Sequence, residues 1–318
     1  MINPKPLFIE RMKKLIPDEN DFSKFNEIIH KEPASSIRCN TLKISPEKLK
    51  ERLEEKGWKI KQPFPNNKEI MIIENSLLPG SLGKSIEHLL GYFYVQEISS
   101  MLPILALKPK ENELVLDLCA SPGSKTTQMS ATMENKGTII ANDVAIGRIR
   151  ILNANLERCG CSNVIITRHD AVQLCERLKK IGMKFDKILL DVPCSGEGNT
   201  RSNPKTFIMW NERMIEKLSR LQKMIIASAI DLLKDNGEIV YSTCTYAPEE
   251  NEENIDFLLR NFNLKTEKIE LPVKIRHGIV EWQGKKFDKQ VENSARIYPQ
   301  DNDTEGFFLA KMKFKEER

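Results

Sequence analysis

The chain has 318 residues, of which 40% are hydrophobic and 30% are charged, and its formal net charge is +4. This composition excludes a disordered or fibrous protein. The sequence contains no run of about 18 apolar residues, the length that would predict a membrane-spanning helix. The seven cysteines are scattered and the four histidines are isolated, so we expect neither a disulfide framework nor a metal site. The sequence predicts a cytoplasmic globular protein whose length allows two domains.

The first third of the chain predicts a small α+β module. Ser45 and Pro46 are typical of a helix start and Gly57 of its end, and short strands are expected at 38–43 and 70–73. The whole excess of positive charge lies in this third, which is weak support for a nucleic-acid partner.

The middle of the chain alternates short apolar strands with longer helical segments. Runs of Val, Ile and Leu with little alternation are typical of strands buried on both faces of a parallel sheet. This order predicts right-handed crossovers and a doubly wound α/β sheet, which binds ligands beyond the C-terminal ends of its strands. The expected strands are 114–118, 138–142, 164–168, 187–191, 238–242 and a last one at 307–313; the expected helices are 123–134, 145–159, 171–181 and 212–235, the last one stopping at Gly237.

Four aspartates stand at or just past the ends of four successive predicted strands: Asp117, Asp143, Asp170 and Asp191. Carboxylates at one sheet edge accept hydrogen bonds from ribose hydroxyls or an exocyclic amine, and they suit a positively charged centre. Each aspartate alone fits a turn or N-cap residue equally well. The series together predicts a nucleotide-like cofactor.

The first of these strands leads into the loop Asp117-Leu-Cys-Ala-Ser-Pro-Gly-Ser-Lys125. Its small residues and Gly123 allow the backbone to approach a ligand closely, and the N–H groups of the following helix point toward that ligand. Asp143, 26 residues after Asp117, fits an acceptor for a ribose diol. These spacings leave a nicotinamide dinucleotide and S-adenosylmethionine both open.

Two cysteines follow the fourth and fifth strands, in Asp191-Val-Pro-Cys194 and Tyr241-Ser-Thr-Cys244. Adjacent parallel strands lie roughly 4.8 Å apart, so thiols at neighbouring strand ends are expected to emerge side by side at the ligand crevice. Their polar neighbours disfavour the usual interpretation of cysteine as a small buried hydrophobic residue. We prefer that interpretation for Cys39, Cys159, Cys161 and Cys175.

The segments DLCASPGSKTTQ, DVPCSGEG and YSTCTYAPEENE resemble signature blocks of the RsmB/NOP (Sun) family of RNA cytosine-C5 methyltransferases. The similarity covers about 90–313, and RCNTLK at 38–43 and YVQE at 94–97 resemble the N-terminal region of that family. It implies an enzyme with a Rossmann-like class I methyltransferase sheet, S-adenosylmethionine as cofactor and RNA as partner. Gln300 stands where the family often has histidine, which argues against an acid–base role there.

The resemblance also implies a mechanism. C5 of cytosine is a poor nucleophile, and a thiolate that adds to C6 raises electron density at C5, which then attacks the methyl group. The family pattern makes Cys244 this nucleophile, Cys194 the group that helps release the product, Asp191 the hydrogen-bond partner of the base, and Lys125 a stabiliser of negative charge. It places S-adenosylmethionine against Cys119, Ala120, Ser121, Pro122, Gly123, Ser124, Lys125, Asp143, Arg148, Asp170 and Asp191.

A base in structured RNA must be flipped out before a thiol reaches C6, and RNA affinity comes mainly from phosphate contacts. We therefore predict an RRM-like N-terminal RNA-binding module over 1–95 and a catalytic domain over 96–318. Basic residues of 272–300 and three aromatic residues are further candidates, although solvated surface charge or core packing explains each of them as well. These candidates are Lys274, Arg276, Lys285, Lys286, Arg296, Tyr92, Tyr94 and Trp210.

The predicted substrate is tRNA, because the chain is compact, with rRNA as the main alternative. A DNA cytosine-C5 methyltransferase would use Cys194 as nucleophile, and the presence of Cys244 argues against it. A non-catalytic RNA-binding protein is the remaining hypothesis, which the intact cysteine pair disfavours. We expect a monomer with neither a metal nor a membrane partner.

Overall fold

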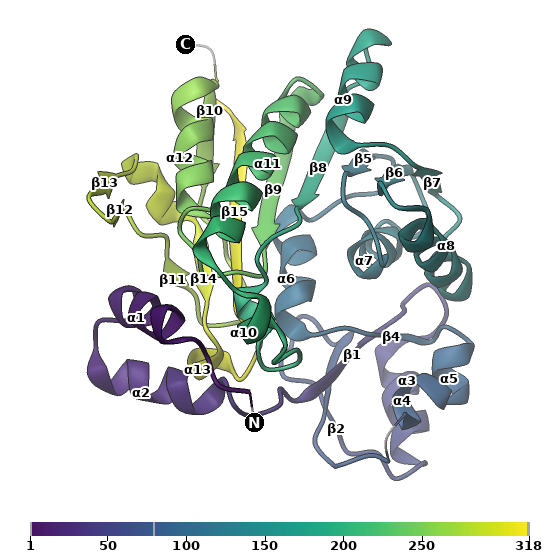
Figure 1. Ribbon diagram of the computed structural model, residues 1–318. Helices are drawn as coiled ribbons and strands as arrows, with labels where there is room; N and C mark the ends of the chain where they lie inside the picture. The colour runs from purple at the N-terminus through teal and green to yellow at the C-terminus, as the bar shows by residue number, and fades with distance from the viewer. Residues whose placement is uncertain (1, 79, 317–318) are drawn as a thin grey trace.

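A nine-stranded mixed sheet occupies the C-terminal two thirds of the protein, in a computed structural model that describes residues 2–78 and 80–316 (Figure 1). Five strands, β5 to β9, are parallel, and β15 joins β9 in antiparallel orientation. In spatial order the strands are β11 (Arg276–His277), β14 (Ala295–Ile297), β15 (Phe307–Phe314), β9 (Leu233–Thr243), β8 (Phe185–Asp191), β5 (Leu114–Asp117), β6 (Thr138–Asn142) and β7 (Val164–Thr167), and β10 (Leu264–Glu267) pairs with β15.

Helices cover both faces of this sheet. Successive side chains of a strand point to opposite faces, so Val115 of β5 packs toward one helical layer and Leu116 toward the other. One layer is α6 (Ile98–Leu107), α7 (Ser124–Thr132) and α8 (Ile146–Cys159), and the other is α9 (Ala171–Lys180), α11 (Glu212–Ile230) and α12 (Glu252–Asn261). The predicted doubly wound α/β sheet is therefore confirmed.

The helix expected over 212–235 ends earlier than predicted. α11 stops at Ile230, and β9 already begins at Leu233, so Gly237 lies inside a strand. The carbonyl of Leu232 accepts a hydrogen bond from the N–H of Phe185, which fixes the chain as sheet at this point. Leu232 fits the apolar spacing of the helix, but it is buried because it directly precedes β9, not because it belongs to α11.

A four-stranded antiparallel sheet precedes the large sheet along the chain, with the order β2-β3-β1-β4. One helix follows β1 and two short helices precede β4, which gives the β-α-β-β-α-β order of ferredoxin-like modules and agrees with the RRM-like expectation. The elements are β1 (Ser35–Cys39), α3 (Pro46–Glu54), β2 (Ile60–Lys61), β3 (Ile70–Ile73), α4 (Ser81–Lys84), α5 (Ile86–Leu89) and β4 (Phe93–Val95).

The strand expected at 38–43 is shifted toward the N-terminus. β1 ends at Cys39 because the side chain of Asn40 turns the chain: its Oδ1 accepts from the N–H of Leu42 at 3.3 Å. Its Nδ2 donates to the carbonyls of Gly91 and Cys159, both at 2.8 Å. The same residue thus ends the strand and ties the small sheet to α8.

One face of the small sheet packs against α6 and α7 rather than facing solvent. Ile70 forms an apolar cluster with Ile98 and Met101 of α6. Tyr94 on the same face is 7% exposed and lies between the guanidinium groups of Arg38 and Arg158. The ring therefore packs between the two sheets, but Tyr94 also lines a cavity at the end of the large sheet, so its stacking on RNA bases stays a prediction.

Two N-terminal helices, α1 (Pro6–Leu15) and α2 (Glu19–Ile28), pack on the large-sheet part of the molecule, beside α13 (Figure 1). Phe8 and Phe25 form an apolar core with Trp210. Trp210 is only 2% exposed, so the hypothesis that its ring stacks on RNA bases is wrong. The remaining elements are η1 (Glu197–Asn199), α10 (Thr206–Met209), β12 (Glu281–Trp282), β13 (Lys285–Lys286), η2 (Lys289–Asn293) and α13 (Pro299–Asn302). Among the described residues, no helix combines the length and apolar character that a membrane crossing needs.

Candidate active site

Two cavities meet beyond the C-terminal ends of β5, β8 and β9. We call the first, of about 450 Å³, the Lys125 cavity, and the second, of about 480 Å³, the Asp143 cavity. Cys244 and Asp191 line both of them, whereas Cys194 lines only the Asp143 cavity. Of the residues proposed from sequence, Cys119, Ala120, Ser121, Pro122, Ser124, Lys125, Asp143, Arg148, Asp170, Asp191, Cys194 and Cys244 line one or both cavities, and Gly123 lines neither.

The loop between β5 and α7 is held in place by α8. Arg148 pairs with the carboxylate of Asp143 at 2.9 Å and donates to the carbonyl of Ser121 at 2.7 Å. The Ser121 hydroxyl in turn donates to the Arg148 carbonyl at 2.9 Å. Gly123 has a φ of 101°, a conformation that side chains disfavour, and it begins the turn into α7. Gly123 therefore shapes the loop, while its neighbours form the wall.

Asp117 carries an unused hydrogen-bond acceptor at this wall. Its side chain is buried, and Oδ2 accepts from the hydroxyl of Thr126 at 2.7 Å. Oδ1 is buried and has no partner among the described residues. Burial raises the pKa of Asp117 to about 7. A buried carboxyl with a free acceptor oxygen is suited to a cationic amino group. The cofactor contacts predicted from sequence do not include Asp117, although Asp117 belongs to the predicted acidic rim.

Two more of the four rim aspartates, Asp143 and Asp170, are partly engaged within the chain. Asp143 is 4% exposed and bound to Arg148, but it still lines the cavity named after it. Asp170 caps α9 by accepting from the N–H groups of Val172 and Gln173 at 3.0 and 3.1 Å, and it lines the same cavity. Asp170 therefore acts as the N-cap of α9 and also lines the cavity.

The two sulfurs lie together where the cavities join. Cys194 Sγ is 3.2 Å from Cys244 Sγ, and the side-chain amide of Asn199 donates to Cys244 Sγ at 3.1 Å. The hydrogen bond with Cys244 and burial raise the pKa of Cys194 well above its ordinary value. Cys194 is therefore a neutral thiol near pH 7, able to donate to the neighbouring sulfur. Asn199 was not among the residues proposed from sequence.

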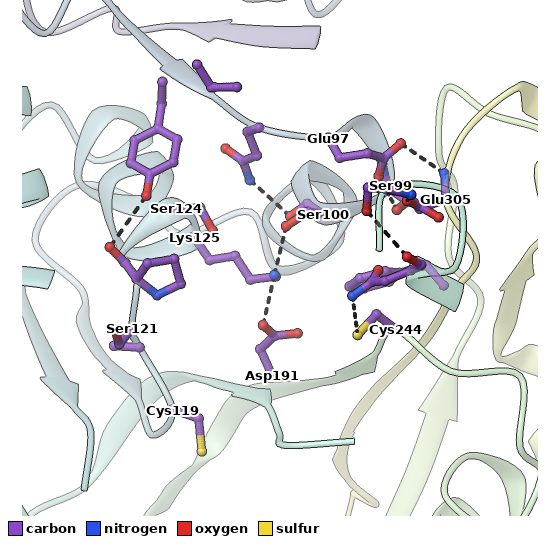
Figure 2. A pocket seen from close by; sticks show the side chains of 18 of the residues that line it. Glu97, Ser99, Ser100, Cys119, Ser121, Ser124, Lys125, Asp191, Cys244 and Glu305 are labelled. Atoms are coloured by element: carbon purple, nitrogen blue, oxygen red, sulfur yellow. Dashed lines mark hydrogen bonds and ion pairs between the residues drawn. The ribbon is translucent and has the colours of Figure 1, made fainter. Parts of the chain in front are cut away.

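Lys125 and Asp191 face each other across the Lys125 cavity. Lys125 Nζ lies 2.8 Å from an Asp191 oxygen, donates to the Ser100 hydroxyl at 3.0 Å, and sits 5.4 Å from the centre of the Phe307 ring. In the view of Figure 2, Lys125 points into the cavity toward Asp191, and Cys244 lies beside Asp191. An ion pair and a nucleophilic sulfur thus share one space.

Two buried glutamates tie the cysteine-bearing loops to each other. Glu250, in the Cys244 loop, accepts from the N–H of Ser195 at 3.0 Å. Glu197, in the Cys194 loop, accepts from the hydroxyl of Thr245 at 3.0 Å. Burial raises the pKa of Glu250 to about 8 and also raises the pKa of Glu197. Both glutamates lie in the segments DVPCSGEG and YSTCTYAPEENE, so the sequence carries a local signal for them, although the residues proposed from sequence do not include them.

The basic residues proposed for RNA contact are largely paired with carboxylates. Arg296 is 3% exposed and binds Glu252 in a buried ion pair at 2.5 Å, so its proposed contact with RNA is wrong. Arg276 bonds Asp21 and Asp301, Lys274 bonds Asp301, and Lys285 bonds Glu253. Lys286 is exposed.

The doubly wound sheet places a cavity that fits a nucleoside next to a pair of thiols. Such a site can bind a nucleotide-like cofactor while one of the thiols reacts covalently with a second substrate. That combination defines the class of Rossmann-like methyltransferases that work through a cysteine nucleophile. The chain belongs to the RsmB/F family of these enzymes: residues 104–313 match the family model described as 16S rRNA methyltransferase RsmB/F. Residues 5–98 match the N-terminal domain of 16S rRNA methyltransferase RsmF. The family uses S-adenosylmethionine to methylate cytosine C5 in RNA.

Individual relatives extend this match. The tRNA (cytosine(49)-C(5))-methyltransferase of Pyrococcus abyssi is 42% identical over 312 residues, which cover 98% of this chain and 96% of that protein. Ribosomal RNA small subunit methyltransferase F of Psychromonas ingrahamii is 39% identical over 310 residues, and the match spans 96% of this chain but 62% of that longer protein.

Solved structures agree with the fold. A methyltransferase homologue from Pyrococcus horikoshii is 32% identical with a TM-score of 0.82, covering 98% of this chain and all of that one. NSun6 from Pyrococcus horikoshii, determined with the S-adenosylmethionine analogue SFG, is 27% identical with a TM-score of 0.83, covering 98% of this chain and 99% of that one. The hypothesis of a DNA methyltransferase finds no support in these matches.

Proposed function

We propose that this chain methylates C5 of a cytosine in tRNA, with Cys244 as the nucleophile that adds to C6. The observation that carries the proposal is the position of the Cys244 sulfur, which lies where the two cavities join, within 3.2 Å of two hydrogen-bond donors. A base in the Lys125 cavity and a methyl donor that extends from the Asp143 cavity to Asp117 would meet at this sulfur. The 42% identity to a tRNA (cytosine(49)-C(5))-methyltransferase over 98% of this chain favours tRNA.

The residues present fit S-adenosylmethionine. The unpartnered, buried Oδ1 of Asp117 suits an ammonium group, and Asp143 suits a ribose diol. Leu221 and Ile225 supply an apolar surface in the Asp143 cavity that suits an adenine ring. The bound cofactor supplies an electrophilic methyl group on a sulfonium.

The chain's own groups handle the base. The Cys244 thiolate adds to C6, which shifts electron density to C5, N3 and O2 of the ring. Asp191 accepts hydrogen bonds from the exocyclic amine, and Lys125, 2.8 Å from Asp191, offsets the charge that builds on the ring. After methylation the C5 proton must leave before the Cys244–C6 bond breaks. Cys194, a thiol 3.2 Å from Cys244, is placed to exchange protons in that step.

The N-terminal module over residues 1–95 is proposed to bind the RNA. Its sheet face toward α6 and α7 is covered, so its loops and helices would make the contacts. We further propose a monomer, because residues of a single chain line both cavities, and a cytoplasmic location, because two free thiols at 3.2 Å persist in a reducing compartment.

Methyl transfer from labelled S-adenosylmethionine to unmodified tRNA tests the proposal. Cys244→Ala is expected to abolish transfer, and Cys194→Ala to accumulate a covalent protein–RNA adduct that survives denaturing electrophoresis. Cys175→Ala is the matched control, since Cys175 is buried on α9 away from both cavities. Full activity of the Cys244→Ala protein would disprove the assignment.

The substrate is settled by bisulfite sequencing of RNA from cells with and without the gene. The first tRNA position to examine is cytosine 49, the target in the name of the Pyrococcus abyssi relative. Loss of a methylated cytosine in small-subunit rRNA instead would favour the second candidate, which the match to the RsmF N-terminal domain supports.

A further inference from the structure

In the part of the chain that the structure describes, no histidine hydrogen-bonds the Cys244 sulfur. Cysteine nucleophiles are commonly activated by a neighbouring base or cation, because the thiolate is the reactive form. Among the described residues, the side chains that hydrogen-bond the Cys244 sulfur are the Cys194 thiol at 3.2 Å and the Asn199 amide at 3.1 Å. The one histidine that lines either cavity is His169, in the Asp143 cavity. The groups in direct contact with the sulfur are therefore hydrogen-bond donors rather than a histidine base.

The backbone places Asn199 against Cys244. The N–H of Gly198 donates to the Cys244 carbonyl at 2.9 Å, and the N–H of Gly306 donates to the Gly198 carbonyl at 3.0 Å. A Cβ on Gly198 would lie 2.1 Å from the Gly306 oxygen and 2.9 Å from the Cys244 oxygen, so only glycine permits this approach. The N–H of Asn199 donates to the Gly196 carbonyl at 3.0 Å, which closes the turn. The amide is thus held on a fixed support beside the sulfur (the dashed line at Cys244 in Figure 2).

We infer that Asn199 is a catalytic residue that activates Cys244 by donating its side-chain N–H to the thiolate. This inference rests on the proposed function, in which Cys244 attacks C6. A hydrogen bond to a charged acceptor is stronger than one to a neutral acceptor, so the bond favours the thiolate over the thiol. A neutral amide supplies this effect without a proton of its own to lose, and it keeps the site free of a competing base.

Other ionisable groups face Cys244 from every element around it. The carboxyls raise the energy of a thiolate, whereas the Lys125 ammonium lowers it. Burial raises the pKa of the two carboxyls behind the cysteine loops, Glu197 and Glu250. For Glu250 the pKa is about 8, so near neutral pH this carboxyl adds less negative charge than an ionised group would. The ionisable groups that line the two cavities beside Cys244 are Tyr94, Glu97, Asp117, Cys119, Lys125, Asp143, Arg148, His169, Asp170, Asp191, Cys194 and Glu305.

The pH dependence of alkylation at Cys244 tests the inference without RNA. The intact protein is treated with iodoacetamide across a pH series, and the modified Cys244 peptide is quantified by mass spectrometry. Asn199→Ala is expected to move the midpoint up by about one pH unit, which is roughly tenfold less thiolate below the midpoint. Asn199→Asp is expected to move it further, because a carboxylate repels the thiolate. Asn153→Ala, at an exposed position on α8, is the control and should leave it unchanged.

Methyl transfer by the same variants provides the second readout. Both Asn199 variants are expected to shift the acidic limb of the kcat/KM profile in the direction of the alkylation midpoint. An unchanged alkylation midpoint in both variants would overturn the inference, even if methyl transfer falls. A midpoint that drops in Asn199→Ala would also overturn it, since the amide oxygen would then face the thiol. A wild-type protein that alkylates as expected but methylates no RNA would refute the proposed function alone.

Discussion

Replacing Glu250 by glutamine should remove a large part of the pH dependence of folding stability. Glu250 is fully buried, and its Oε2 accepts from the N–H of Ser195 at 3.0 Å and from the Gln222 amide at 2.7 Å. Burial raises its pKa from 4.5 to about 8. The folded protein therefore holds a proton on Glu250 at pH 6 that the unfolded chain has already released.

The sign and size of the effect follow from proton linkage. Between the unfolded and folded pKa values the folded state binds more protons, so stability is complete below pH 4.5 and falls as pH rises toward 8. With those two values, the contribution of Glu250 to the free energy of unfolding falls by about 2.5 kcal/mol from pH 5 to pH 7. Glutamine keeps an acceptor oxygen for Ser195 and Gln222, has the shape of the protonated carboxyl, and does not titrate.

Urea unfolding at pH 5 and pH 7 measures this difference. Wild type and Glu250→Gln are both expected to lose stability with rising pH, because burial also raises the pKa of Asp117, Glu197 and Glu305. The loss in Glu250→Gln should be smaller than in wild type by about 2.5 kcal/mol. Equal losses in the two proteins would refute the assignment of a buried, protonated Glu250.

Three further outcomes are expected. Asp117→Asn should weaken S-adenosylmethionine binding about tenfold or more in calorimetry, because the free Oδ1 acceptor loses its charge; unchanged affinity would contradict the role of Asp117. Gly198→Ala should lower the thermal midpoint and abolish methyl transfer, since its Cβ would meet the Gly306 oxygen at 2.1 Å; an active, stable variant would contradict this packing. Arg296→Met should cost about 3–5 kcal/mol in urea unfolding by leaving Glu252 buried and unpaired; a variant of normal stability with a marked loss of RNA affinity would instead return Arg296 to the RNA surface.

The order of the large sheet could be predicted because its signal is local. Strands such as 138–142 are buried on both faces, so each is a continuous apolar run, and the helices between them show helical spacing. The end of α11 was missed for the same reason, since Leu232 and Leu233 are apolar both as a continued helix and as a strand. Only the pairing of Leu232 with Phe185 separates these cases.

The residues of the site also fall into those that a local sequence pattern predicts and those whose role depends on distant contacts. Cys194 and Cys244 could be placed side by side because each follows a strand, and neighbouring strands set their spacing. The role of Asn199 depends on Gly198 meeting Gly306, more than 100 residues along the chain, and no local pattern encodes that approach. The sequence places Arg296 among basic residues of a positively charged segment, whereas the partner that neutralises it, Glu252, is 44 residues away along the chain.

The buried face of the small sheet limits how this protein can be re-engineered. Arg38 on β1 is 2% exposed, donates to the carbonyl of Ser124 at 2.7 Å and to the hydroxyl of Thr127 at 2.8 Å, and thereby reaches the first turn of α7. A graft that exchanges the N-terminal module between relatives, to redirect the enzyme to another transcript, would break these bonds. Such a chimera has to carry the matching surface of α6 and α7 with the module, so the unit of exchange is larger than the sheet itself.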